Sequence, residues 1–123
     1  PDGNALIVGK FLPASLVRVS LPDGAAVVPI ALSSDPLPSP DGLAVLDGDL
    51  YAVSDASVSR VRLNADASVG EVVSVSQKSG LSTATVAESA LYVIKSEVLN
   101  SVLMRPLNTP FEIFRVDVDA FDQ

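Results

Sequence analysis

The sequence contains neither cysteine nor histidine, and these two absences exclude several classes of protein. Without cysteine there is no disulfide framework, no thiolate nucleophile and no zinc–sulfur site. Without histidine there is no Ser-His-Asp triad, no imidazole metal ligand and no histidine proton shuttle near neutral pH. Any chemistry in this chain must therefore depend on carboxylates, hydroxyl groups, lysine, arginine and the backbone.

Basic residues are also few. Eight Lys and Arg residues stand against 15 Asp and Glu residues, which gives a net charge of −7 at pH 7. The resulting negative potential repels a phosphate backbone or an anionic lipid surface. No apolar run approaches the roughly 18 residues that a membrane-spanning helix requires. We therefore expect neither nucleic-acid binding nor membrane insertion.

What the sequence does have is a series of short, valine-rich runs in which apolar and polar residues alternate. The composition is 48% hydrophobic, which excludes an intrinsically disordered chain. In residues 16–21, Leu16, Arg18 and Ser20 fall on one face, and this period of two is typical of a half-buried strand. Turn-forming residues separate the runs, and Asp47-Gly48-Asp49 is a hairpin signal.

This pattern predicts an all-β fold. A short helical turn is expected over residues 97–105, where apolar residues have helical spacing. Ten strands are predicted, over residues 4–10, 15–21, 26–32, 42–47, 50–54, 58–63, 70–76, 83–88, 90–95 and 111–118.

The predicted strands repeat along the chain. The apolar blocks that begin at Leu6, Leu50 and Leu91 recur at intervals of 44 and 41 residues. Arginine also recurs, in the strand that follows each block, at positions 18, 60 and 115. A period of about 40–50 residues with four strands in each repeat indicates the blades of a β-propeller. A two-sheet sandwich with coincidentally spaced strands is the alternative.

The repeats are not all complete. Residues 36–80 supply a four-stranded blade, residues 1–35 lack its inner strand, and residues 81–123 lack its outer strand. We therefore predict a partial β-propeller, an arc of about two and a half four-stranded antiparallel blades within one domain. Such an arc leaves strand edges unpaired. We expect the remainder of the propeller to come from another chain, a cleaved part or a symmetry mate.

Two stretches of the central repeat resemble a known family. Pro40-Asp41-Gly42-Leu43-Ala44-Val45, followed by Gly48-Asp49-Leu50-Tyr51-Ala52-Val53, is similar to the blade signature of the senescence-marker, gluconolactonase and luciferin-regenerating-enzyme superfamily of six-bladed propellers. The opening residues 1–8 resemble the hairpin of another blade, and residues 109–116 resemble the final strand of one branch of that superfamily. The resemblance covers nearly the whole chain and corresponds to the C-terminal portion of a family member.

The resemblance implies a function for the complete propeller, a metal-dependent hydrolase of the lactonase type. A divalent cation at the channel mouth, Ca²⁺, Mg²⁺, Mn²⁺ or Zn²⁺, would polarise the carbonyl of a small-molecule substrate and activate water. Asp41 stands where the family has one metal ligand, whereas the family's Glu and Asn ligands would lie outside this chain. No organic cofactor is expected. The superfamily also includes propellers that perform cyclisations without a metal, and this segment alone is not expected to catalyse a reaction.

Each of these residues also has a simpler interpretation. Asp41 lies in a Pro-Asp-Gly turn, and Asp2 and Asp23 lie in the same tripeptide. The three recurring arginines are expected to form structural ion pairs with neighbouring acids. Lys95 and Ser96 are adjacent on a predicted strand and point to opposite faces, which argues against a Ser–Lys nucleophile. The alternative function is therefore a non-catalytic propeller that serves as a scaffold for ligand binding or protein assembly.

Overall fold

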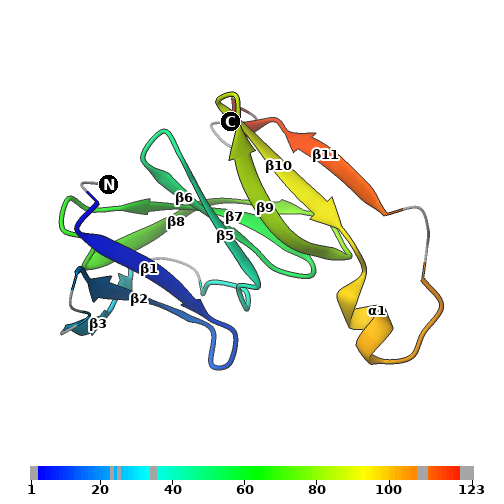
Figure 1. The fold of residues 1–123 in the computed structure, drawn as a ribbon, viewed down its shortest axis with the longest axis horizontal. Coiled ribbons are helices and arrows are strands. Elements are labelled where there is room, and N and C mark those ends of the chain that lie inside the picture. The colour runs from blue at the N-terminus through cyan, green and yellow to red at the C-terminus, as the bar shows by residue number, and fades with distance from the viewer. Residues whose placement is uncertain (1–2, 23, 25, 34–35, 108–110, 120–123) are drawn as a thin grey trace.

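The structure is a computed structural model that describes residues 3–22, 24, 26–33, 36–107 and 111–119. These residues form three β-sheets, side by side, with one short helix (Figure 1). The prediction of an all-β fold is confirmed.

The first sheet has three antiparallel strands that follow one another along the chain: β1 (Ala5–Lys10), β2 (Ser15–Ser20) and β3 (Val27–Pro29). The third sheet is also antiparallel and three-stranded, with β10 (Ala90–Lys95) between β9 (Leu81–Ala87) and β11 (Glu112–Val116). Helix α1 (Val98–Val102) lies in the connection from β10 to β11 and buries none of its residues. Among the described residues, no helix has the length and apolar character needed to cross a membrane.

The middle sheet has five strands. Four of them are antiparallel and keep their sequence order across the sheet: β5 (Gly42–Leu46), β6 (Asp49–Val53), β7 (Ser57–Leu63) and β8 (Val69–Gln77). The fifth, β4 (Ala31–Leu32), pairs in parallel with the outer edge of β8.

One predicted strand divides. Residues 26–32 were expected to form a single strand, but they form β3 in the first sheet and β4 in the middle sheet. At the junction the backbone N–H of Ile30 still donates to Leu16 of the first sheet, at 3.0 Å, whereas that of Ala31 donates to Ser68, at 2.9 Å. The chain therefore crosses between neighbouring sheets at residue 30, and the side chain of Ile30 is buried between them.

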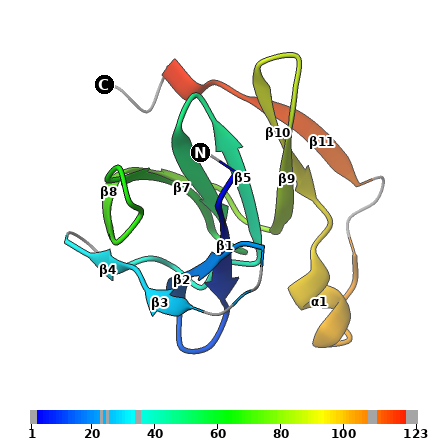
Figure 2. The same ribbon diagram turned by 60° about the vertical axis from the view of Figure 1, so that its left-hand side comes forward.

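Two hydrophobic layers hold the three sheets together. The layer between the first and middle sheets contains Leu16, Leu50 and Val61, and the layer between the middle and third sheets contains Tyr51, Val53 and Leu91. Alternate residues of β6 enter opposite layers, so all five of its residues are buried. Figure 2 shows β5 of the middle sheet beside β9 of the third sheet. β6 is therefore at the centre of the packing.

The β5–β6 hairpin of the middle sheet and the β9–β10 hairpin of the third sheet use the same kind of turn. Asp47 and Gly48 have φ values of 51° and 85° between β5 and β6, as a type I′ turn requires. Glu88 and Ser89 have φ values of 49° and 60° between β9 and β10. The Asp-Gly turn was predicted, whereas Glu88-Ser89 carries no glycine or asparagine to mark it.

The backbones of β5 and β9 approach closely at a glycine. A Cβ atom at Gly42 would lie 2.5 Å from Oγ1 of Thr83 and 2.7 Å from its Cα atom. Such distances are shorter than van der Waals contact, so only glycine fits at this position without moving β9. Gly42 therefore fixes the distance between the middle and third sheets.

Candidate functional site

Asp41, the predicted metal ligand, lies immediately before β5 and is exposed to solvent. Its backbone N–H donates to the carbonyl oxygen of Val53, the last residue of β6, at 2.7 Å. This bond continues the β5–β6 ladder by one residue and holds the Asp41 backbone at the end of the sheet. The carboxylate is thus on an ordered backbone and available to solvent.

Paired serine hydroxyl groups occupy the same end of the middle and third sheets. The hydroxyl oxygens of Ser54 and Ser57 are 2.9 Å apart, and both residues are buried. The Ser96 hydroxyl donates to the Ser82 hydroxyl at 2.8 Å. Each pair therefore places two hydrogen-bonded hydroxyl groups at the end of the sheets where Asp41 lies.

A second carboxylate at this end was not found from the sequence. Glu97 is only 5% exposed, and its backbone N–H donates to the carbonyl oxygen of Gly80 at 3.1 Å. It has the left-handed backbone conformation, with φ 51°, directly before α1. Its position after a predicted strand gave no signal of burial, because glutamate is rarely buried unless it has a partner.

The described residues do not bring together a set of metal ligands. Over residues 3–22, 24, 26–33, 36–107 and 111–119, no group of three Asp, Glu, His or Cys side chains could hold a metal ion. Asp41 could therefore supply one carboxylate, and a set of three such side chains at this position would need at least one from outside the described residues. Asp2 and Asp23, which share the Pro-Asp-Gly motif, lie outside the described residues.

One of the three recurring arginines forms the expected ion pair. Nε of Arg60 lies 2.6 Å from Oδ2 of Asp49, and Nε of Arg62 lies 3.7 Å from Oδ1 of the same carboxylate. Asp49 is 8% exposed. Within the described part of the chain, Arg18 and Arg115 make no such pair.

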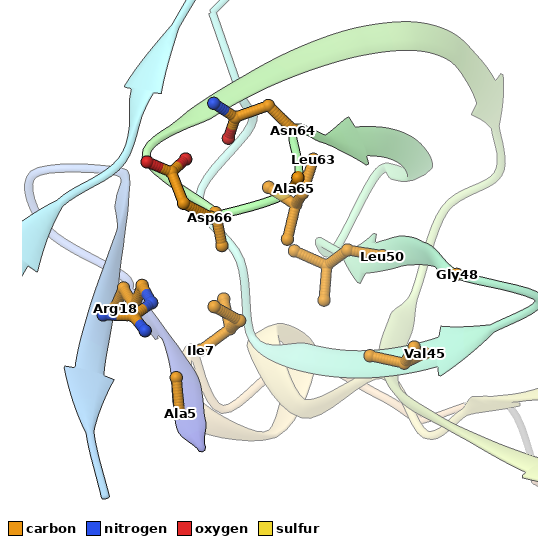
Figure 3. A pocket seen from close by; sticks show the side chains of 11 residues that line it. Ala5, Ile7, Arg18, Val45, Gly48, Leu50, Leu63, Asn64, Ala65 and Asp66 are labelled. Carbon is orange, nitrogen blue, oxygen red and sulfur yellow. The ribbon is translucent and has the colours of Figure 1, made fainter. Parts of the chain in front are cut away.

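Arg18 instead borders a cavity of about 500 Å³ between the first and middle sheets, which we call the Arg18 cavity (Figure 3). Ile7, Leu50 and Leu63 form apolar walls. The loop between β7 and β8 closes one side with Asn64 and Asp66.

The polar groups of that loop are bound to their own turn. The amide oxygen of Asn64 accepts from the backbone N–H groups of Ser68 and Val69, both at 2.9 Å. Oδ1 of Asp66 accepts from the Ser68 hydroxyl at 2.7 Å and from its backbone N–H at 3.1 Å. Hydrogen bonds from Ser68 lower the pKa of Asp66, because they stabilise its ionised form. Asp66 is therefore a fixed negative charge at the rim of the cavity.

Arg115 has a comparable position in the third sheet. It borders a smaller cavity, of about 380 Å³, that is also lined by Asp117 and Asp119. Two carboxylates share this second cavity with the guanidinium group, whereas Asp66 is the one carboxylate that lines the Arg18 cavity among the residues that the structure describes.

No protein-family model matches the chain, and no curated protein is significantly similar to it in sequence.

Proposed function

We propose that the three sheets are successive blades of a β-propeller and that this chain is an arc of it. The sequence order of β5 to β8 across the middle sheet, from the edge next to β9 outward, supports this arrangement. The close approach of Gly42 to Thr83 also supports it, because adjacent inner strands of a propeller lie side by side around its axis. The remainder of the propeller, in another chain, a cleaved part or a symmetry mate, would cover the edge of β1 and the outer face of the third sheet.

The function that we propose for the complete propeller is metal-dependent hydrolysis of a lactone-like small molecule. The single observation that carries this proposal is the position of Asp41. Its carboxylate is exposed immediately before β5, the edge strand of the middle sheet that lies against β9. In the proposed propeller, strand ends from neighbouring blades would converge at this end of β5. Carboxylate oxygens suit Ca²⁺, Mg²⁺, Mn²⁺ and Zn²⁺. Oxygen ligands from blades outside this chain would complete the site, and the cation would polarise the substrate carbonyl.

A non-catalytic scaffold is the second candidate. The observation that favours it is the absence, among the described residues, of a group of three metal-ligand side chains. A propeller whose channel mouth lacks a complete set of metal ligands would bind a ligand or another protein without activating water.

Asp41→Asn tests the proposed site in the complete protein. We expect the substitution to weaken binding of Mn²⁺ or Ca²⁺ at least about tenfold, because it removes one charged ligand. It should leave the melting temperature of the metal-free protein nearly unchanged, because the structural hydrogen bond at this position comes from the backbone N–H. Isothermal titration calorimetry with each metal chloride measures the affinity.

Asp47→Asn is the matched control. Asp47 is exposed at the opposite end of β5 and has φ 51°, which asparagine adopts readily. Asp47→Asn removes one negative charge from the hairpin that Asp41 precedes, so a general electrostatic effect on metal affinity would appear in both variants. Equal metal affinity in the wild type and Asp41→Asn would reduce Asp41 to a turn residue and favour the scaffold.

A further inference from the structure

Arg18 has in the first sheet the position that Arg60 has in the middle sheet. Arg18 is paired across its sheet with Ile7, and Arg60 is paired with Tyr51. Ile7 packs into the layer between the first and middle sheets, and Tyr51 packs into the layer between the middle and third sheets. Cross-strand partners share a face, so each arginine is on the face directed toward the next sheet.

Among the described residues, no carboxylate is paired with Arg18 as Asp49 is paired with Arg60. Asp49 lies two residues before Tyr51 and forms the 2.6 Å ion pair with Arg60. The residue two positions before Ile7 is Ala5. The Arg18 guanidinium donates from Nη1 to the Ser20 hydroxyl, at 3.3 Å. Since a guanidinium group has five N–H donors, Arg18 keeps donors for a further acceptor.

The residues at positions 5 and 7, which correspond to Asp49 and Tyr51 of the middle sheet, explain the space in front of Arg18. Asp49 and Tyr51 are buried in the middle sheet, with 8% and 3% of their surface exposed. Ala5 and Ile7 are smaller, and both line the Arg18 cavity. Figure 3 shows them beside Arg18, with Leu50 and the β7–β8 loop on the other side. The cavity is therefore open where the middle sheet has an acid and an aromatic ring.

We infer that the Arg18 cavity binds a small molecule with one carboxylate and an aliphatic body. The carboxylate takes the place that Asp49 has beside Arg60, in a charge-assisted and bidentate arrangement that arginine favours. The aliphatic body contacts Ile7, Leu50 and Leu63, since ligand sites are mostly apolar with few polar anchors. The fixed charge of Asp66 at the rim repels a second anionic group, so the site selects monocarboxylates.

This inference is independent of Asp41. The cavity is lined by Val45 and Gly48, at the end of β5 and in its turn, whereas Asp41 precedes the first residue of β5. A ligand in the Arg18 cavity would therefore be at the opposite end of the sheets from the proposed metal. Failure of one site would leave the other unaffected.

Calorimetric titration of the complete protein with hexanoate tests the inference. We expect binding that Arg18→Gln weakens by about tenfold or more, as loss of a charge-assisted hydrogen-bond pair predicts. Ala5→Asp should abolish hexanoate binding, because the new carboxylate would pair with Arg18 as Asp49 pairs with Arg60 and would fill the cavity. The melting temperature of this variant should be no lower than that of the wild type. Hexanamide, which lacks the charge, and adipate, which adds a second carboxylate, should both bind more weakly than hexanoate.

Arg115→Gln is the matched control, because Arg115 is paired with Tyr92 in the third sheet as Arg18 is with Ile7. It should leave hexanoate affinity unchanged. Unchanged affinity in Arg18→Gln, equal loss in Arg115→Gln, or no hexanoate binding to the wild-type protein would each overturn the inference. If Ala5→Asp does not fold, the comparison of Arg18→Gln with Arg115→Gln still decides it.

Discussion

Gly42→Ala is expected to lower the free energy of unfolding by about 2–3 kcal/mol, the upper part of the range for overpacking a core. The added methyl group would lie 2.7 Å from the Cα atom of Thr83, so a rotamer change cannot relieve the clash. The backbone of β9 must move instead, and the layer around Tyr51 and Leu91 must move with it. Urea unfolding measures the change.

Gly70→Ala is the control for this result. A Cβ atom at Gly70 would lie 3.1–3.2 Å from methyl groups of Leu32, Val61 and Leu63. Side-chain methyl groups can shift by a few tenths of an ångström, so this substitution should cost less than about 1 kcal/mol. If Gly42→Ala cost no more than Gly70→Ala, the close contact of β5 with β9 would be wrong.

Asp49→Ala is expected to lower the free energy of unfolding by about 2–3 kcal/mol. This is less than the cost of breaking a fully buried ion pair, because the Asp49–Arg60 pair is partly exposed. The substitution leaves Arg60 without its 2.6 Å partner. A double-mutant cycle with Arg60→Ala isolates the interaction. We expect Asp49→Ala to cost much less in the Arg60→Ala background, and strictly additive effects would contradict a structural role for the pair.

The strands could be predicted because their sequences carry strong local signals. The alternation of residues 16–21 and the Asp-Gly turn at Gly48 act within a few residues, and both are present in the structure. The crossing at Ile30 was missed because it depends on hydrogen bonds to Leu16 and Ser68, which are distant in sequence. Glu88 and Ser89 adopt left-handed conformations that their residue types do not favour. The pairing of the two flanking strands therefore determines the conformation of this turn, and the residue types of the turn do not.

In the candidate sites too, features with a local sequence signal could be predicted and features that depend on sheet packing could not. The position of Asp41 immediately before a strand followed from the turn and the strand that flank it. The burial of Glu97 and the cavity beside Arg18 did not follow, because both depend on how neighbouring sheets pack. A signal for the cavity was nevertheless present in the sequence. Aligning the repeats places Ala5 where the middle repeat has Asp49, and that difference marks an arginine without its acid.

Sedimentation of this chain alone, combined with urea unfolding, tests the proposed propeller arc most directly. Leu6 and Val8 of the edge strand β1 are 53% and 40% exposed, and Ile113 of the third sheet is 68% exposed. Apolar residues beside unpaired strand edges favour association. We therefore expect the chain alone to self-associate or to unfold without cooperativity, and to become a single sedimenting species when the rest of the propeller is present. A stable, cooperatively unfolding monomer of these 123 residues would contradict the arc and favour a closed sandwich.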